Sequence, residues 1–301
     1  MNASSSAHIA VPTSAIVLLG LLAVFWGLNW PIMKIGLSEV SPWIFRTAAN
    51  LSGALGLFLI ARARHLPLTV PREQRKGLLI AALLNMTLWN ILVLYGINLM
   101  NSGRAAILAY TMPLWATLLS SLFLGEKLTY RAVIALLFGL FAMSLLFFGA
   151  ADNPIEERIL GPLLVVLAAF SWGAGTVAIK YYRFNMPVTV LTAWQHLIGV
   201  LPIAVVALVW DTHAMGPIHL LPALCVVYNM TVTAIFCYWA YFKVVSALPV
   251  VVSTVGTLMV PVLGVLFNAM IFDEPPIATD YLALSAVVIA VFLVLTRRPV
   301  S

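Results

Sequence analysis

The sequence has very little charge. Only 9% of its 301 residues are Asp, Glu, Lys or Arg, whereas 63% are hydrophobic and the mean hydropathy is +1.06. Soluble domains carry about 25% charged residues, because water must solvate their surface. A chain this poor in charge is typical of a protein surrounded by lipid, which excludes the soluble globular classes.

The sequence also lacks disulfide frameworks, metal-ligand clusters and basic stripes. Its two cysteines, Cys225 and Cys237, lie on one predicted helix, about 18 Å apart and too far to bridge. The 16 Lys and Arg residues are spread over many short loops, which argues against a nucleic-acid partner. Without a His-Glu-x-x-His, a Gly-x-Ser-x-Gly or a buried acid pair, an intramembrane enzyme is disfavoured, and we expect no cofactor.

Long charge-poor runs predict an all-α integral membrane protein with ten transmembrane helices. Most runs reach the ~20 residues that cross a bilayer. The predicted spans are 15–36, 42–61, 77–98, 104–124, 130–150, 160–181, 187–210, 219–242, 248–271 and 279–296. Pro113 and Pro261 fall inside two of them, and we expect a kink at each.

The basic residues predict the orientation of these helices. With the N-terminus in the cytoplasm, twelve of the 16 Lys and Arg residues lie on the inner side. The other four, Lys34, Arg46, Arg104 and Arg158, fall outside or near the outer face. This positive-inside bias predicts that both termini are cytoplasmic.

The chain repeats itself in two halves. Trp26-Gly27 recurs as Trp172-Gly173, 146 residues later, and Asn85-Met86-Thr87 recurs as Asn229-Met230-Thr231, 144 residues later. We expect two five-helix repeats, residues 1–150 and 151–301. Because five is odd, the second repeat enters the membrane in the opposite sense. The sequence therefore predicts inverted repeats around a central cavity, with the site between them.

Several motifs resemble one transporter family. Residues 25–29 (Phe-Trp-Gly-Leu-Asn) and 171–173 (Ser-Trp-Gly) resemble the Trp-Gly motif of the drug/metabolite transporter superfamily. Residues 109–113 (Ala-Tyr-Thr-Met-Pro) and 124–129 (Leu-Gly-Glu-Lys-Leu-Thr) resemble the end of the fourth helix of EamA-type repeats, and 273–275 (Asp-Glu-Pro) a degraded second copy. Within the superfamily the chain looks most like the YddG-type bacterial amino-acid exporters. The resemblance implies ten helices, cytoplasmic termini and export of small metabolites.

Polar and aromatic side chains inside the spans are the candidates for a substrate site, because lipid cannot solvate polar groups. Trp26 and Asn29 share one helix face, and Trp172 repeats Trp26. Indoles suit apolar or aromatic cargo, while Asn and Tyr both donate and accept, as a zwitterion requires. The alternative is that these residues hold helices together. The predicted substrate-binding residues are Trp26, Asn29, Asn90, Tyr110, Trp172, Tyr228, Tyr238 and Ser253.

No predicted span carries an Asp or Glu near its centre. Proton-driven antiporters commonly relay protons through such a carboxylate, so we expect uniport down the substrate gradient. Glu126 and Glu274 lie at helix ends, where we expect solvated or paired structural roles. His196 lies well inside a span, and we expect it to be a neutral, hydrogen-bonded packing residue, although histidine is also the natural proton switch.

These patterns favour a multi-pass bacterial inner-membrane exporter that works by alternating access. We expect its cargo to be neutral, aromatic or methionine-like amino acids and related small metabolites. The alternative is a proton-coupled exporter of hydrophobic drugs or other metabolites, although an organic cation would call for a buried anion. The expected partners are this small-molecule substrate and the lipid bilayer. We expect a monomer, and a dimer stays open.

Overall fold

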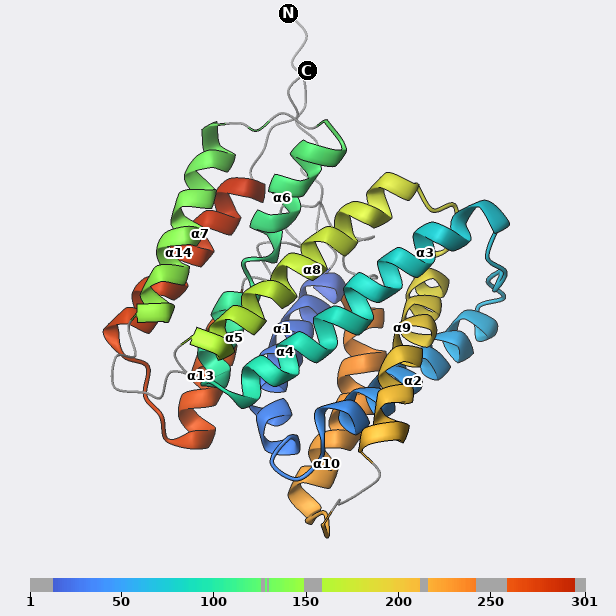
Figure 1. Ribbon diagram of the computed structural model, residues 1–301, viewed down its shortest axis with the longest axis horizontal. Helices are drawn as coiled ribbons and strands as arrows, with labels where there is room; N and C mark the ends of the chain where they lie inside the picture. Colours follow the sequence, from blue (N-terminus) through green and yellow to red (C-terminus); the bar gives the residue numbers. More distant parts are fainter. Residues whose placement is uncertain are drawn as a thin grey trace, which may run out of the picture.

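A computed structural model describes residues 13–125, 128, 130–148, 159–211, 216–241 and 259–295. Every regular element within those residues is helical (Figure 1). The elements are α1 (Thr13–Gly36), α2 (Pro42–Ala63), the short turn η1 (Arg72–Gln74), α3 (Arg75–Ala82), η2 (Leu83–Leu88), α4 (Trp89–Asn98), α5 (Ser102–Ala109), α6 (Met112–Phe123), α7 (Tyr130–Phe148), α8 (Gly161–Tyr182), α9 (Val188–Trp210), α10 (Leu220–Tyr228), η4 (Asn229–Cys237), α13 (Met259–Phe272) and α14 (Ala278–Leu295).

Nine predicted spans coincide with these helices to within two residues at each end, because the helix that contains α10 and η4 continues to Tyr241. The other, 248–271, begins outside the described residues and ends one residue before α13 does. Among the described helices, seven are long and apolar enough to cross a membrane, and three shorter ones, 130–146, 259–272 and 278–293, are also apolar.

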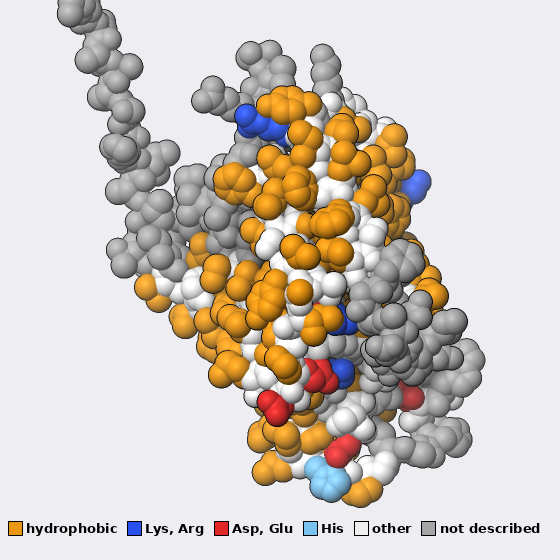
Figure 2. Space-filling model, turned by 90° about the vertical axis from the view of Figure 1, so that its left-hand side faces the viewer, with side chains coloured by type: hydrophobic (Ala, Val, Ile, Leu, Met, Phe, Trp, Pro, Cys, Tyr) orange, Lys and Arg blue, Asp and Glu red, His pale blue; other side chains and the backbone are white. Residues whose placement is uncertain are grey.

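The outer surface of the bundle is apolar. Leu55 is 62% exposed and Leu208 is 72% exposed. Figure 2 shows hydrophobic side chains over most of one described face, with acidic side chains gathered toward one end. Water would make such a continuous apolar surface unstable, whereas lipid solvates it. The described helices therefore form a multi-pass membrane protein.

Helices from the two halves of the chain pack against one another (Figure 1). Helix α2 packs along α9, α7 along α14, and α5 along α13. Helix α1 packs on α13 and on α10, while α8 packs on α6 and on α4. The core therefore lies between the two halves of the sequence.

The two copies of Asn-Met-Thr lie in π-helical segments that we did not predict. They are η2 and η4. A π turn changes the hydrogen-bond register of the backbone, so that the Leu84 carbonyl accepts from the Trp89 N–H, five residues further along. The Ser171 hydroxyl donates to the Leu84 carbonyl at 2.7 Å, and the Ser52 hydroxyl donates to the Met230 carbonyl at 2.8 Å. Each π segment is thus supported by a serine from the other half.

The fourth span is broken near its middle, as Pro113 predicts. Helix α5 ends at Ala109 and α6 begins at Met112, with Pro113 in its first turn. Proline lacks the N–H that would continue the helical ladder. The break leaves Tyr110 between the two pieces. Pro261 lies in the first turn of α13, and the expected kink before it falls outside the described residues.

The glycines of the two Trp-Gly motifs allow helices to approach closely. A Cβ at Gly27 would lie 2.7 Å from the Cβ of Leu263 on α13. A Cβ at Gly173 would lie 2.9 Å from the backbone nitrogen of Ala116 on α6. Either methyl would push two packed helices apart.

Candidate functional site

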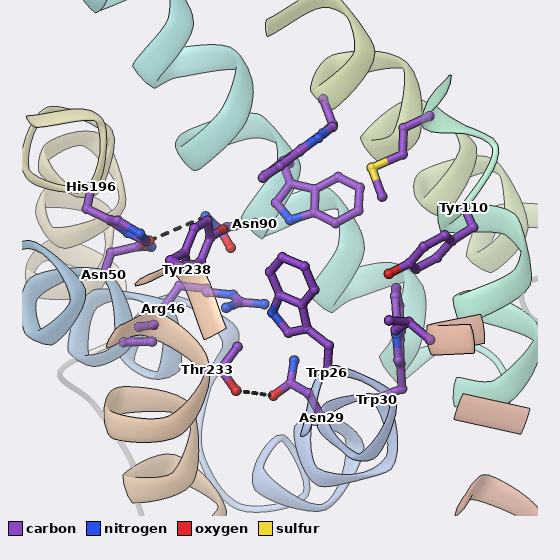
Figure 3. A pocket seen from close by; sticks show the side chains of 16 residues that line it. Trp26, Asn29, Trp30, Arg46, Asn50, Asn90, Tyr110, His196, Thr233 and Tyr238 are labelled. Carbon is purple, nitrogen blue, oxygen red and sulfur yellow. Dashed lines mark hydrogen bonds between the residues drawn. The ribbon is translucent and has the colours of Figure 1, made fainter. Parts of the chain in front are cut away.

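A cavity lies where the two halves of the chain meet (Figure 3). It has a free volume of about 100 Å³, which is room for roughly seven to ten water-sized groups. This is the scale of a small metabolite. Its walls come from α1, α2, α4, α6, α8, α9, η4 and α13. The lining residues are Trp26, Asn29, Trp30, Arg46, Ala49, Asn50, Trp89, Asn90, Tyr110, Met112, Trp172, His196, Thr233, Ala234, Tyr238 and Val260.

The structure brings six of the eight predicted site residues together in this cavity. They are Trp26, Asn29, Asn90, Tyr110, Trp172 and Tyr238. Tyr228 is elsewhere: its hydroxyl donates to the Phe25 carbonyl at 2.8 Å, so it joins α10 to α1, and it is not among the residues that line the cavity. Ser253 lies outside the described residues. That the six bind substrate stays a prediction.

Aromatic side chains form most of the cavity wall. The rings of Trp89 and Trp172 are 5.1 Å apart between centroids, and Trp26 meets Tyr238 edge to face at 6.0 Å. The Tyr110 ring stands on the far side from His196, with its hydroxyl directed inward (Figure 3). Such rings offer apolar area together with polar edges, which suits a small amphipathic ligand.

One polar network joins α1, α2 and η4 at the cavity wall. The Asn229 amide donates to Asn29 Oδ1 at 2.7 Å, and the Thr233 hydroxyl donates to the same oxygen at 2.8 Å. Arg46 Nη1 donates to Asn229 Oδ1 at 3.4 Å, and its Nη2 contacts the Met33 sulfur at 3.1 Å. These partners hold the guanidinium with its plane reaching toward the centre of the cavity (Figure 3).

A second network contains His196, which is buried and hydrogen-bonded as expected. Its Nδ1 lies 2.9 Å from Asn50 Oδ1, and Asn90 Nδ2 lies 3.5 Å from that oxygen. His196 also meets Tyr238 edge to face at 4.8 Å. His196 also lines the cavity. Among the described residues, its Nε2 and Asn50 Nδ2 have no hydrogen-bond partner.

Arg46 corrects the sequence interpretation. We placed it with the basic residues near the outer face, because it lies only four residues into its span. The structure buries it to 7% exposure and turns it into the cavity. One signal could have identified it: Arg46 and Asn50 lie at i and i+4 on one face of an otherwise apolar helix, and an ionisable residue inside a span is a functional candidate.

No carboxylate among the described residues lines the cavity. Asp280 forms an ion pair with Arg104 at 2.7 Å, away from the cavity. Glu274 accepts hydrogen bonds from Asn101 and Asn268, which confirms its structural role, while Glu126 lies outside the described residues. The described residues also hold no cluster of His, Cys, Asp and Glu that could bind a metal ion.

Comparison with known proteins decides the family. The sequence pattern of the EamA-like transporter family matches residues 13–148 and again residues 159–296. The chain belongs to the EamA-like transporter family. It is a membrane transporter of EamA type, in the drug/metabolite transporter superfamily.

Known proteins are similar to this EamA-type transporter over most of its length. The uncharacterized transporter YoaV of Bacillus subtilis is 26% identical over 260 residues, which cover 86% of this chain and 89% of YoaV. An Escherichia coli protein named "Probable amino-acid metabolite efflux pump" is 25% identical over 269 residues, covering 86% and 87% of the two chains. A crystal structure with 18% identity has a TM-score of 0.66 and covers 93% of this chain and 96% of that chain, which shows a shared fold.

Proposed function

We propose that this EamA-type transporter exports amino acids and related small metabolites across the bacterial inner membrane by alternating access. The observation that carries the proposal is the cavity between the two halves, lined by indoles and tyrosines from both halves and by amides from the first. A site at the interface of two repeats becomes accessible from either side when one repeat rocks against the other.

The proposal includes ten membrane spans arranged as two inverted five-helix repeats, residues 1–150 and 151–301. Two separate matches of the family pattern, one in each half, support a duplication. The packing supports an axis between the halves: α1 lies on α13 as α8 lies on α6, and α2 lies on its counterpart α9. We propose that the three shorter apolar helices, α7, α13 and α14, also cross the membrane.

The orientation follows from the basic residues. Twelve of the 16 lie on one side of the proposed topology, which places both termini in the cytoplasm. Arg46 does not alter this, because a buried residue inside a span carries no weight in a loop count. We propose a monomer, since the cavity is complete within one chain.

Amino acids fit the chemistry of the cavity wall. Apolar or aromatic side chains match the indoles, and the amide and hydroxyl groups can hydrogen-bond the polar end. A relative bears a name that includes an amino-acid metabolite. Organic cations fit poorly, because the described lining carries a guanidinium and no carboxylate.

We propose uniport. A proton relay would need a group that changes charge at the site, and no described carboxylate lies there. The test uses proteoliposomes with equal labelled phenylalanine, leucine or methionine on both sides. We expect counterflow exchange, and no net accumulation when a pH gradient is imposed. Uncoupler-sensitive accumulation that His196→Ala removes would contradict uniport and assign the relay to the cavity histidine.

A further inference from the structure

Arg46 is a buried cation that has no anionic partner among the described residues. Its side chain is 7% exposed, and its Nε has no hydrogen-bond partner in that part of the chain. Its two terminal nitrogens contact only the Asn229 amide oxygen at 3.4 Å and the Met33 sulfur at 3.1 Å. A thioether is a weak acceptor. Burying a charge with so few partners is costly, so such groups in membrane proteins mark sites where a ligand completes the set.

Arg104, which does not line the cavity, shows how the protein itself provides a hydrogen-bond partner for a guanidinium. Its Nε donates to Asp280 Oδ1 at 2.7 Å, and its Nη2 approaches Asp280 Oδ2 at 3.5 Å. This is the forked pairing that guanidinium and carboxylate prefer. Arg46 has no carboxylate partner of this kind among the described residues, and its side chain lines the cavity. A carboxylate from outside the chain would fill the position that Asp280 fills for Arg104.

The surroundings of Arg46 fix its position before any ligand arrives. Asn229 accepts from Arg46 and donates to Asn29, which also accepts from Thr233. The guanidinium is therefore held on one side by a chain of amides, and it reaches toward Trp26 (Figure 3). Preorganised donors of this kind bind an anion with little loss of side-chain entropy.

The described cavity offers no matching anion for an ammonium group. Its other polar side chains are neutral amides, hydroxyls and an imidazole. An amine without a carboxylate would bring a second positive charge beside Arg46, which lowers affinity. A carboxylic acid that lacks the amino group would lose only the weak contacts that an ammonium group makes with neutral side chains and ring faces.

We propose that Arg46 binds the carboxylate of the substrate, so that the cavity selects small amphipathic carboxylic acids whether or not they carry an α-amino group. The apolar body lies against Trp26, Trp89 and Trp172. This inference rests on the proposed function and sharpens it: amino acids are one part of a wider class of exported monocarboxylates.

The test compares three ligands with the same ring: L-phenylalanine, 3-phenylpropionate and 2-phenylethylamine. Binding is measured by titration calorimetry on the full-length chain in lipid nanodiscs, which avoids leakage of the weak acid and base through vesicles. We expect L-phenylalanine and 3-phenylpropionate to bind with Kd values within about threefold of each other. We expect no measurable binding of 2-phenylethylamine. A Kd for 3-phenylpropionate more than tenfold weaker than that of L-phenylalanine would overturn the proposal, because it would reveal a site for the ammonium group.

Variants of the two arginines provide the matched comparison. Arg46→Gln should weaken both acids at least tenfold, whereas Arg46→Lys should retain part of the affinity as a single point charge. The double variant Arg104→Gln with Asp280→Asn removes an internal ion pair and should leave both Kd values unchanged. Unchanged binding in folded Arg46→Lys and Arg46→Gln would overturn the proposal. If Arg46→Gln does not fold, the three-ligand series on the parent and Arg46→Lys still decide.

The two proposals fail in different ways. Counterflow of phenylalanine that does not depend on Arg46 would leave the exporter standing and remove the carboxylate site. Arg46-dependent binding of 3-phenylpropionate without any binding or exchange of amino acids would keep the carboxylate site and remove amino-acid export.

Discussion

The two copies of Asn-Met-Thr have the same local structure and different surroundings. Both lie in π-helical segments, and both asparagines are buried. Asn85 donates to Gln195 Oε1 on α9 at 3.0 Å, which is a neutral amide pair. Asn229 donates to Asn29 and accepts from Arg46. The same motif thus connects helices in one half, and in the other it holds Asn29 and Arg46, which line the cavity.

The second helix of each half explains the difference. Counting 146 residues from Arg46, the interval between the two tryptophans, leads to Thr192. Only the first half therefore supplies a charge at this depth. An internal duplication gives a symmetric scaffold, and a single non-equivalent residue makes its cavity electrically asymmetric. A substrate with one charged end and one apolar end fits such a cavity in one orientation.

The largest difference between the two halves should appear when Asn229 or Asn85 is replaced. Asn229→Ala leaves Arg46 with fewer partners and should lower the free energy of unfolding by about 2–3 kcal/mol, whereas Asn85→Ala, which loses one neutral pair, should cost about 1 kcal/mol. Acid binding should weaken at least tenfold in Asn229→Ala and stay unchanged in Asn85→Ala. Denaturant titration and calorimetry measure the two quantities.

Asn229→Asp separates positioning from stability. Its carboxylate would pair with Arg46, so the folded protein should regain stability but bind acids no better than Asn229→Ala. Tight binding in Asn229→Asp would show that Asn229 has only a structural role.

The two Trp-Gly glycines should differ less. Both Gly173→Ala and Gly27→Ala overfill a tight helix contact, at a cost of about 1–3 kcal/mol. Neither contact can be relieved by a side-chain rotation, because the added Cβ meets a backbone nitrogen at 2.9 Å at Gly173 and the Cβ of Leu263 at 2.7 Å at Gly27. Unfolding free energies of the two variants should therefore fall by similar amounts, and a loss at only one of the two glycines would refute this.

The indole pair should affect transport more than folding. Trp26→Ala and Trp172→Ala each remove an aromatic contact of about 0.5–1.5 kcal/mol beyond buried area, which corresponds to a severalfold to tenfold rise in KM for aromatic cargo. Exposed Phe123→Ala, far from the cavity lining, is the control. Parent transport rates in both tryptophan variants would remove the indoles from the site.

The smallest effect concerns a pair of loop contacts at equivalent places in the two halves. Glu39 accepts from the His219 backbone N–H at 2.6 Å, and the Asn185 N–H donates to Gln74 Oε1 at 3.2 Å. The His219 backbone N–H, then its side chain, hold the pKa of Glu39 below the usual 4.5, against a smaller opposing effect of desolvation.

A lowered carboxyl pKa contributes stability that is present above pH 4.5 and is lost as the pH falls through the lower folded value. The melting temperature of the parent should therefore fall slightly more than that of Glu39→Gln between pH 5 and pH 3. Gln74→Ala should shift the melting temperature equally at both pH values. A pH-dependent shift in Gln74→Ala would contradict the assignment, because that contact has no titrating group.

Much of this molecule could be predicted from the sequence. Apolar runs of about 20 residues predict helices, because a membrane requires every backbone group to bond within its own segment. The recurrence of Trp26 as Trp172 predicted a shared cavity wall, and the structure places both there. Asn29, Asn90, Tyr110 and Tyr238 lie in the same wall. Periodicity is a local property, so it can be found without knowing the neighbours.

The surroundings of each side chain were decided only by the tertiary structure. Tyr228 and Tyr238 lie on one span, yet Tyr228 meets a backbone carbonyl of α1 and Tyr238 meets the cavity. The π turns between them rotate the helix away from regular spacing, and no propensity predicts that. Arg46 is the clearest case. Its sequence position places it near a membrane face, whereas its burial beside the cavity depends on Asn229, 183 residues away, and on Met33. A local sequence pattern fixes which helix face a charge occupies, but only the packing of distant helices decides whether that face meets lipid, an acid or an empty cavity.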